Sequence, residues 1–587
     1  MYDLIIRNGF IVDGTGRDGY PADIGIEGGR IRQIGGLSEA EAVREIDAAG
    51  RTVTPGFIDM HSHADQTILA YPQMESMLHQ GITTFVGCQC GQSNAPIGPY
   101  WLGNQADFDL LVSLIPKVYP DMYAEDYWVY TKDIAPLIEQ ERGYRPDWRS
   151  FGEWLDRIDR CGLSGNIITL LGYSTIRMNL TGPDGNHRLS EEEKEKLRPQ
   201  IREALEAGAF GMSVGLDYEP GIFSDTAELM EMTRELKPYE GIYFTHWRKT
   251  GLRSGTPKKQ KKIDGIRETL EIGLQNELQT EISHLSTGYD VFPADDDYMQ
   301  VAAAERTLQV IDSYLERGAR SHFDVIPNTT GGTMIYPDLI TLFRPWYYLS
   351  GGIALFLKNL RGKDYREMIA AEIYGGRYFT LNPRINPDWD EGITVLQCRE
   401  AQYVGRTIQE IARGMGRESL EAVFELLLID PAVKIFRATH SMNIHAVHTY
   451  LKHPEATVGN DTFVFDLQST CKQIPTHPGR LPNPNTYCGF VKFVTELGMP
   501  RLEDTIRKIT GKPAEILGLS DRGLIREGYR ADLLLLDMER LHACENLIDP
   551  RVYPTGVESV LVNGVLVLEN GKHTGARPGG VIRRQSR

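Results

Sequence analysis

The sequence predicts an α/β fold, a (β/α)8 barrel of the TIM type with a small β-sandwich domain formed by the N- and C-terminal segments. Strand-like runs alternate with helix-like runs through the middle of the chain, which predicts parallel strands joined by crossover helices. The alternation extends over roughly 450 residues, a length that favours a closed barrel over an open sheet. Short apolar runs separated by Gly, Asp and Asn at both chain ends predict the sandwich.

The two chain ends read as parts of one β-domain. The N-terminus contains "YDLIIRNGFIVDGTG" and "ADIGIEGGRIRQIGG", and the C-terminus contains "GLIREGYRADLLLLD" and "GVESVLVNGVLVLENGKHTG". The Asn-Gly pairs are typical of hairpin turns. We therefore assign residues 1–55 and 518–587 to the sandwich and residues 56–517 to the barrel, with an aromatic-rich insertion at 99–150.

The middle of the chain supplies the alternating elements. "NIITLLGYS" precedes "SEEEKEKLRPQIREALEAG", a predicted helix that starts with a Ser cap and acidic residues in its first turn. "GAFGMSVGLDY", "GIYFTH" and "QTEISH" are strand-like runs that each precede a helix-like run, and "SHFDVIP" follows them. These runs predict the parallel strands of the barrel.

The net charge and the cysteine content indicate where the protein is located and which classes of partner it can bind. The net charge of −17 and the pI near 5.4 argue against nucleic acid or an anionic membrane as the main partner. Seven scattered cysteines, an odd number, indicate reduced thiols. The sequence shows no signal peptide and no apolar stretch of about 18 residues. We therefore expect a cytoplasmic protein without a membrane partner, and composition leaves a homo-oligomer open.

Metal-binding residue types follow the predicted strands. The carboxyl ends of the strands carry the chemistry in a (β/α)8 barrel, and imidazole, thiolate and carboxylate groups suit zinc. A lone histidine is more often a structural residue, but a set at successive strand ends predicts a metal site. The set comprises His61, His63, Cys90, His246, His284 and Asp461.

Cys88 competes with Cys90 for the thiolate position. The two residues would lie on the same face of a regular strand, because strand side chains alternate. A core thiol is the other interpretation of either residue. The nearby His-x-His favours a ligand, and we select Cys90. A disulfide between them is disfavoured, since side chains two apart on a strand run parallel.

These residues lie in motifs that resemble the amidohydrolase superfamily, specifically its D-aminoacylase (N-acyl-D-amino-acid deacylase) branch. "GFIDMHSHAD" is similar to the first metal motif of the superfamily, and "GITTFVGCQCGQSNAP" is similar to a cysteine motif of the branch. "GYSTIR", "GAFGMSVGLDYEPG", "YFTHWR", "ISH", "HPEATVGND" and "ITGKPAEILGLSDRGLIREGYRADLLLLD" follow in the order of the branch. The resemblance covers nearly the whole chain.

The resemblance implies a zinc-dependent hydrolase that cleaves a linear amide in a small molecule. Cys90, His246 and His284 match the tight zinc ligands of the branch, while His61 and His63 match a second, weaker metal position. Asp461 matches the general base, which would activate metal-bound hydroxide. The implied substrate is an N-acyl-D-amino acid or a related N-acyl small molecule.

The chain departs from the branch where relatives bind the α-carboxylate of the substrate. The positive charge that relatives carry at those positions is missing from this chain. The residues found there are Ser286, Ile326, Gly332 and Asn485. A buried carboxylate without partners costs several kcal/mol. Either Arg248, Lys249 or Arg480 supplies the cation, or the substrate lacks the usual α-carboxylate, which we favour. The substrate-binding candidates are Arg248, Lys249, Ser286, Asn485 and Tyr218.

The insertion at 99–150 is a second departure. Its aromatic residues predict either a lid that contacts the substrate or an oligomer contact. They are Tyr100, Trp101, Tyr127, Trp128 and Tyr130. Two alternative functions remain beside the linear amidase. One is a cyclic-amide hydrolase of the hydantoinase or dihydroorotase type, which Cys90 disfavours, and the other is an inactive scaffold.

Overall fold

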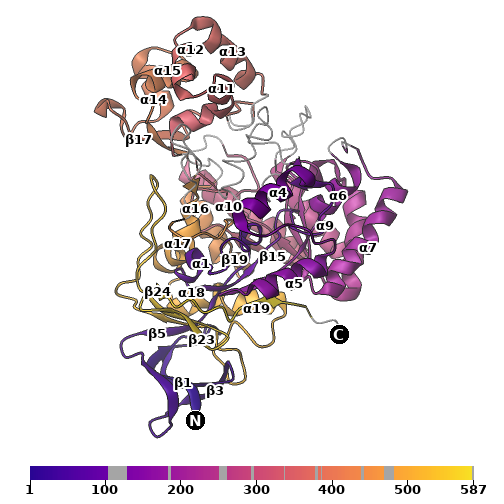
Figure 1. The fold of residues 1–587 in the computed structure, drawn as a ribbon, viewed down its shortest axis with the longest axis vertical. Helices are drawn as coiled ribbons and strands as arrows, with labels where there is room; N and C mark the ends of the chain where they lie inside the picture. Colours follow the sequence, from indigo (N-terminus) through magenta and orange to yellow (C-terminus); the bar gives the residue numbers. More distant parts are fainter. Residues whose placement is uncertain are drawn as a thin grey trace.

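The computed structural model describes residues 1–102, 128–182, 185, 187–249, 261–291, 296–332, 334–335, 337–376, 381–384, 387–437, 442–468 and 481–584. Figure 1 shows a sheet-rich end that carries the N-terminus, a central body of strands and helices, and a helical lobe at the opposite end.

A nine-stranded sheet combines strands from both ends of the chain. Its order is β24-β23-β22-β21-β5-β1-β2-β3, and β4 pairs with β1. The antiparallel pairing of β5 with β21 joins the two chain ends, with Val53 opposite Leu535. The strands are β1 (Tyr2–Ile11), β2 (Tyr20–Glu27), β3 (Arg30–Gly35), β4 (Ala42–Asp47), β5 (Thr52–Pro55), β21 (Leu533–Leu536), β22 (Val557–Val562), β23 (Val565–Glu569) and β24 (Lys572–His573).

Parallel strands form two sheets in the central body. One has the order β25-β10-β7-β6 and the other the order β11-β12-β13-β14-β15-β19. The predicted α/β class is therefore confirmed. The strands are β6 (Phe57–Asp59), β7 (Ile82–Val86), β10 (Asn166–Ile168), β11 (Leu171–Gly172), β12 (Gly211–Gly215), β13 (Ile242–His246), β14 (Gln279–Ile282), β15 (Arg320–Val325), β19 (Ala456–Val458) and β25 (Val581–Ile582).

Helices connect these strands and cover them in Figure 1. The predicted helix after "NIITLLGYS" is α7 (Glu191–Ala207), and Ser190 and Glu193 form the capping box at its start. The other helices of the central body are α1 (Glu75–Leu78), α4 (Thr131–Arg142), α5 (Phe151–Cys161), α6 (Tyr173–Thr181), α8 (Thr226–Met232), α9 (Lys262–Asn276), α10 (Asp297–Leu315), α16 (Ile444–Lys452), α17 (Asn485–Lys492), α18 (Leu502–Lys508) and α19 (Gly511–Leu517).

The helical lobe lies between β15 and β19 in the sequence and has its own buried apolar cluster, which includes Phe343, Trp346 and Phe424. Sequence reasoning placed these residues in the barrel without distinguishing a lobe, because amphipathic helices have the same pattern in either place. The lobe contains α11 (Arg344–Leu349), α12 (Ile353–Asn359), α13 (Lys363–Tyr374), α14 (Ile408–Met415), α15 (Ser419–Ile429), β17 (Ile393–Gln397) and β18 (Lys434–Arg437).

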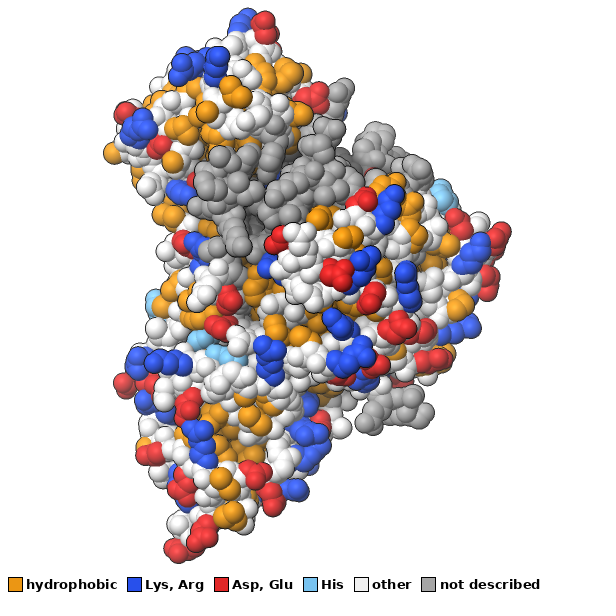
Figure 2. Space-filling view, viewed as in Figure 1, with side chains coloured by type: hydrophobic (Ala, Val, Ile, Leu, Met, Phe, Trp, Pro, Cys, Tyr) orange, Lys and Arg blue, Asp and Glu red, His pale blue; other side chains and the backbone are white. Residues whose placement is uncertain are grey.

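The described surface is mixed in character. Figure 2 shows acidic and basic side chains intermingled over one face, with apolar side chains gathered on the helical lobe. Leu349 and Leu355 of the lobe are exposed apolar residues. Among the described residues, the helices are all too short or too polar to cross a membrane.

Candidate metal centre

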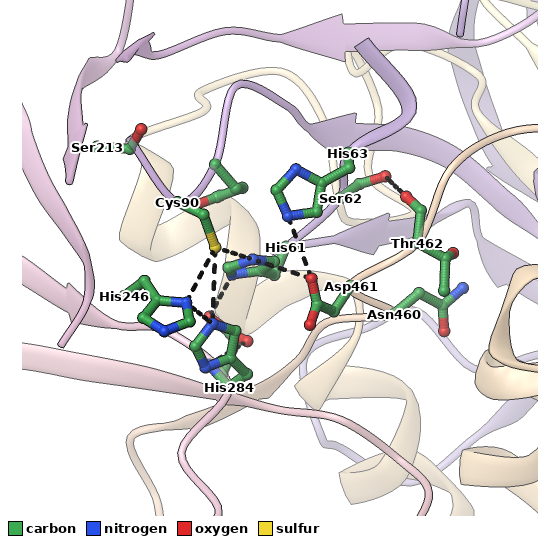
Figure 3. Close-up of polar contacts among 12 residues, drawn as sticks. His61, Ser62, His63, Cys90, Ser213, His246, His284, Asn460, Asp461 and Thr462 are labelled. Carbon is green, nitrogen blue, oxygen red and sulfur yellow. Dashed lines mark hydrogen bonds and ion pairs between the residues drawn. The ribbon is translucent and has the colours of Figure 1, made fainter. Parts of the chain in front are cut away.

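The predicted ligands converge in one place, as Figure 3 shows. Their donor atoms form two groups, and within each group these atoms lie within 4.8 Å of one another. Cys90 belongs to both groups. The first group comprises His61, His63, Cys90 and Asp461, and the second comprises Cys90, His246 and His284.

Parallel strands bring three of these residues to one end of the sheet. His246 is the last residue of β13, and His284 and Asp461 lie just beyond the ends of β14 and β19. Neighbouring parallel strands end at the same edge, so residues far apart in the sequence meet there. The sequence prediction of strand-end positions holds for these three residues.

His61, His63 and Cys90 differ in detail from the predicted strand positions. β6 ends at Asp59 and β7 ends at Val86, so all three residues lie in the loops that follow. The expectation that Cys88 and Cys90 share the parity of a regular strand is therefore wrong. Both have positive φ angles, 62° and 58°, and such a backbone cannot continue a strand.

The loop geometry also separates Cys88 from Cys90. Cys90 Sγ lies in both groups of donor atoms. Cys88 is fully buried among apolar residues, and its backbone N–H donates to Asp65 at 2.8 Å. Burial raises the pKa of the Cys88 thiol well above its usual value, which keeps it protonated. Cys88 is thus a core thiol in this structure.

The second group fits a tetrahedral metal ion. Cys90 Sγ lies 3.5 Å from His246 Nδ1 and 3.6 Å from His284 Nε2, and the two nitrogens are 3.0 Å apart. Zinc bonds of about 2.1 Å to nitrogen and 2.3 Å to sulfur imply spacings of about 3.3–3.6 Å between ligand atoms. The two sulfur–nitrogen distances match this range, and the nitrogen–nitrogen distance of 3.0 Å is shorter. The chemistry and burial of the donors suit a metal such as zinc.

The first group is organised around a carboxylate. Asp461 Oδ1 lies 3.2 Å from His63 Nε2 and 3.5 Å from His61 Nε2. The backbone N–H of Asp461 donates to the carbonyl of His61 at 2.8 Å, which fixes the loop after β19 against the loop after β6. Cys90 Sγ lies 3.4 Å from His61 Nε2 and so links the two groups.

Three residues of the cluster have left-handed backbone conformations. The φ angles are 58° at Cys90, 39° at His284 and 54° at Asp461. Such conformations cost about 1–3 kcal/mol each for residues other than glycine, and they concentrate at functional sites. The backbone strain therefore coincides with the convergence of the side chains.

Carboxylates control the charge of His61 and His63. Burial opposes the charged form of both rings, but acidic neighbours outweigh it. Asp324, whose Oδ2 lies 3.3 Å from His61 Nδ1, raises the pKa of His61 together with Cys90. Hydrogen bonds to Asp461 and Cys90 raise the pKa of His63 to about 10 despite burial. Both rings therefore hold protons in the metal-free protein.

His284 has the opposite environment. Burial, followed by the nearby Lys249 ammonium, lowers the pKa of His284 to about 4. Lys249 Nζ lies 2.9 Å from His284 Nδ1. Burial would raise the pKa of Cys90, but His61 and His246 lower it well below its usual value. A neutral imidazole and a thiolate are the ligand forms that metals require.

Asp324 is a functional candidate that sequence reasoning missed. Its carboxylate contacts His61 and accepts a hydrogen bond from the backbone N–H of His284 at 2.8 Å. An outer partner of this kind orients a ligand ring. Its signal was present, because Asp324 lies near the end of the strand-like run "SHFDVIP".

Arg248 and Tyr218 have protein partners near the cluster. The Arg248 guanidinium donates to the carbonyls of Ile222 and Ser224 at 3.1 and 2.7 Å and pairs with Glu268 at 3.3 Å. The Tyr218 hydroxyl donates to the carbonyl of Cys90 at 2.7 Å. In these contacts Arg248 ties loops together and Tyr218 supports the cysteine loop.

The remaining substrate-binding candidates are neutral. Ser286 lies two residues beyond His284 and is buried. Asn485 begins α17, and its Oδ1 accepts a hydrogen bond from Asn328 Nδ2 at 2.9 Å. The Nδ2 atom of Asn485 is buried and has no hydrogen-bond partner among the described residues. Arg480 lies outside the described residues.

Residues 103–127 of the aromatic insertion lie outside the described residues, and the segments on either side of them are described. β8 (Tyr100–Leu102) pairs with β9 (Trp128–Tyr130), and the rings of Tyr100 and Tyr130 are 5.4 Å apart. Tyr127 lies outside the described residues. The choice between a lid and an oligomer contact stays a prediction.

Comparisons with known proteins found similar chains among amidohydrolases. The model of the amidohydrolase family matches residues 44–129 and 495–568. A D-aminoacylase of Alcaligenes xylosoxydans xylosoxydans is 26% identical, covering 99% of this chain and 98% of its own length. An N-acyl-D-glutamate deacylase of the same organism is 27% identical, covering 100% and 97%. A D-aminoacylase crystal structure matches with a TM-score of 0.67 at 25% identity, covering both chains fully.

The full-length matches show that the chain is similar to amidohydrolases, and the parallel strands and the ligand cluster are consistent with that similarity. The predicted hydrolase class, acting on C–N amide bonds other than peptide bonds, is confirmed. Within that class the chain is related to D-aminoacylases and N-acyl-D-amino-acid deacylases, so the resemblance predicted from its motifs is confirmed as well.

Proposed function

We propose that the protein is a zinc-dependent deacylase of N-acyl-D-amino acids or closely related N-acyl small molecules. The observation that carries the proposal is the convergence of Cys90, His246 and His284, with 3.0–3.6 Å between their donor atoms. Asp461 lies beside them in the same cluster. The D-configuration is supported by the names of the full-length relatives.

The scaffold in this proposal is a closed (β/α)8 barrel. One hydrogen bond and one chain connection support closure of the two parallel sheets. The backbone N–H of Met60, after β6, donates to the carbonyl of Val458 in β19 at 3.2 Å. On the other side, β10 and β11 follow each other along one run of the chain, separated by Thr169 and Leu170.

The metal ligands divide into a tight and a weaker position. Cys90, His246 and His284 would hold the tight zinc ion, and His61 and His63 would hold a second, weaker ion. Zinc bound there supplies Lewis-acid chemistry, because it polarises an amide carbonyl and lowers the pKa of water. A solved structure of a related D-aminoacylase is described as having a binuclear metal centre, which supports the two positions.

Asp461 is the general base of the proposal. Burial would raise the pKa of Asp461, but the hydrogen bond from His63 and the charge of His61 lower it. The carboxylate is therefore ionised and able to take a proton from water. It then returns the proton to the departing amide nitrogen, so that one residue serves both proton transfers.

The substrate in this proposal is a small-molecule amide. Nucleic acid and membranes are excluded as partners in it, which the net charge of −17 supports. The cyclic-amide alternative has no contact in the described site that favours it. The scaffold alternative is opposed by the simultaneous presence of the ligand cluster and Asp461.

The test is an assay of the zinc-loaded protein on N-acetyl-D-amino acids, their L-enantiomers and a hydantoin. We expect release of acetate from the D-compounds, stoichiometric zinc in the protein, and loss of activity after chelation. Turnover of the hydantoin alone would contradict the linear-amide assignment. Absence of tightly bound zinc would support the scaffold interpretation.

A further inference from the structure

A small apolar cluster borders the ligand cluster on its His63 side. The Phe463 ring of this apolar cluster lies 6.3 Å from the His63 ring, measured between their centres. Phe463 also follows the general base Asp461 by two residues. The buried members are Phe463, Phe465, Leu481 and Tyr487, and Tyr71, Ile335 and Tyr553 pack against them.

The apolar cluster is assembled at the end of the strands that carries the metal ligands. Phe463 comes after β19, and Tyr71 lies in the loop between β6 and α1. Two short strands beyond β15 and before α17 complete it, since β16 (Met334–Ile335) pairs with β20 (Leu481–Pro482). Loops at the carboxyl ends of parallel strands are where α/β enzymes bind their substrates.

Hydrogen bonds fix Phe463 next to the histidine pair. The carbonyl of the preceding residue, Thr462, accepts a hydrogen bond from the backbone N–H of His63 at 2.8 Å and another from the Ser62 hydroxyl at 3.1 Å. Figure 3 shows this loop beside Asp461 and His63. The backbone that carries Phe463 is therefore tied to the loop that carries the proposed metal ligands.

Two members of the apolar cluster reach the surface to the same small extent as the groups of the metal centre. Phe463 is 6% exposed and Leu481 is 7% exposed, and His63 and Asp461 have the same values of 6% and 7%. Phe465 is only 1% exposed, and its ring packs edge-on against Phe463 at 6.0 Å. Phe463 is therefore the supported aromatic ring that a ligand at the metal centre can contact.

The opposite side of the ligand cluster is polar. Lys249 Nζ lies 2.9 Å from His284 Nδ1, and Asp217 Oδ2 lies 4.0 Å from His246 Nε2. An N-acyl amino acid has a polar amino-acid end and an acyl end without charge. Burial of apolar area favours the acyl end on the apolar side, where a charged group would lose its solvation. The polarity of the site thus directs the acyl group toward Phe463.

We propose that Phe463 lines a subsite for the acyl group and makes the enzyme selective for apolar acyl groups larger than acetyl. The inference rests on the proposed function and names the acyl part of its substrate. Phe463 contributes binding and takes no part in proton transfer, so its effect depends on how much apolar surface the acyl chain buries. Each fully buried methylene group raises affinity about fourfold.

The test compares N-hexanoyl-D-alanine with N-acetyl-D-alanine, whose acyl chains differ by four methylene groups. For the zinc-loaded wild type we expect kcat/KM to be about tenfold higher, or more, for the hexanoyl compound, which partial burial of these groups supplies. Phe463→Ala should lower kcat/KM for the hexanoyl compound by about tenfold and for the acetyl compound by less than about threefold. Phe463→Trp narrows the subsite and should shift the preference toward acetyl.

A matched variant separates contact with the acyl group from support of the fold. Phe465→Leu changes the same residue type in the same cluster, but behind Phe463, and should alter the hexanoyl-to-acetyl ratio by less than about threefold. Zinc content and the circular dichroism spectrum should stay as in the wild type in all three variants. An equal loss for both compounds in Phe463→Ala would mean that the ring only supports the Asp461 loop, and would overturn the proposal.

The amino-acid side chain is the other apolar group that a substrate could place against Phe463. N-acetyl-D-leucine and N-acetyl-D-alanine differ in that side chain, and Phe463→Ala should leave the ratio of their kcat/KM values unchanged. A fall in this ratio, with an unchanged hexanoyl-to-acetyl ratio, would assign the subsite to the side chain and overturn the proposal.

The remaining outcomes distinguish the subsite from the deacylase function. Equal turnover of the hexanoyl and acetyl compounds by the wild type would overturn the subsite but not the function. If no compound is hydrolysed, the proposed function fails, and calorimetry with the zinc-loaded protein decides on the subsite. Tighter binding of N-hexanoyl-D-alanine than of N-acetyl-D-alanine, lost in Phe463→Ala, supports the subsite, and any other result overturns it.

Discussion

The two sides of Cys90 differ in charge although both present a pair of histidines. His61 and His63 lie among carboxylates, which raise the pKa of both rings against the effect of burial. His284 lies beside Lys249, and burial with that cation lowers its pKa to about 4. The His61 and His63 rings therefore hold a proton, whereas the His284 ring is neutral.

This difference predicts unequal metal positions. A metal ion competes with protons for imidazole nitrogen, so a ring that is already neutral binds metal without releasing a proton. His284 fits that condition, and Cys90 Sγ lies at tetrahedral spacing from the ring nitrogens of His246 and His284. The following variants test whether the two sides differ as proposed.

The largest effect is expected at Cys90, because both sides depend on its sulfur. Cys90→Ser should remove stoichiometric zinc and lower kcat/KM by more than about 100-fold, since changes to outer partners alone cost about 10- to 100-fold. Zinc content by mass spectrometry and initial rates measure this. Cys88→Ser is the matched control, because Cys88 is buried outside both groups. Stoichiometric zinc in Cys90→Ser would contradict the assignment.

Asp461→Asn should have the next largest effect. The amide cannot take the proton from water, and general acid–base catalysis contributes about 10²- to 10⁴-fold. We expect kcat to fall within that range while zinc content and the circular dichroism spectrum remain as in the wild type. A variant that keeps its zinc and nearly full kcat would remove Asp461 from the mechanism.

Single histidine variants compare the two sides directly. His246→Ala should release the tight zinc ion and lower kcat/KM by more than about 100-fold. His63→Ala should keep one zinc ion and lose less activity, although it also removes the contact with Asp461 Oδ1. Equilibrium dialysis with zinc measures both. Loss of all zinc in His63→Ala, with retention in His246→Ala, would reverse the assignment of the two positions.

The fold was predictable where the chain pattern is local. Alternating strands and helices predicted the α/β class, and the Ser190 cap marked the start of α7. The helical lobe was not predicted, since its separation depends on which apolar faces pack together. Its cluster around Phe343 and Phe424 is made of helices whose sequence pattern would serve equally well in a barrel.

The site was predictable in its residues and less so in its electrostatics. Strand ends and motif order indicated the candidate ligands, and the structure brings their donor atoms together. The alternation of side chains along a strand could not decide between Cys88 and Cys90, because both residues lie in a loop with positive φ angles, and the sequence does not show these angles. Likewise the contacts of Asp324 with His61 and of Lys249 with His284 join segments far apart in the sequence, and spacing along the chain does not reveal them.

The smallest expected effect is a difference in the pH at which the two sides release zinc. In the metal-free protein His63 keeps its proton below about pH 10, whereas His284 is neutral above about pH 4. Acidification from pH 8 to pH 5 should therefore weaken the His61 and His63 position first, by up to about tenfold per pH unit. Protonation of Cys90 affects both positions alike and cannot create the difference.

Zinc stoichiometry across this range should fall from two to one in the wild type and stay at one in His63→Ala. Simultaneous release of both ions would show that the carboxylates and Lys249 do not distinguish the two sides.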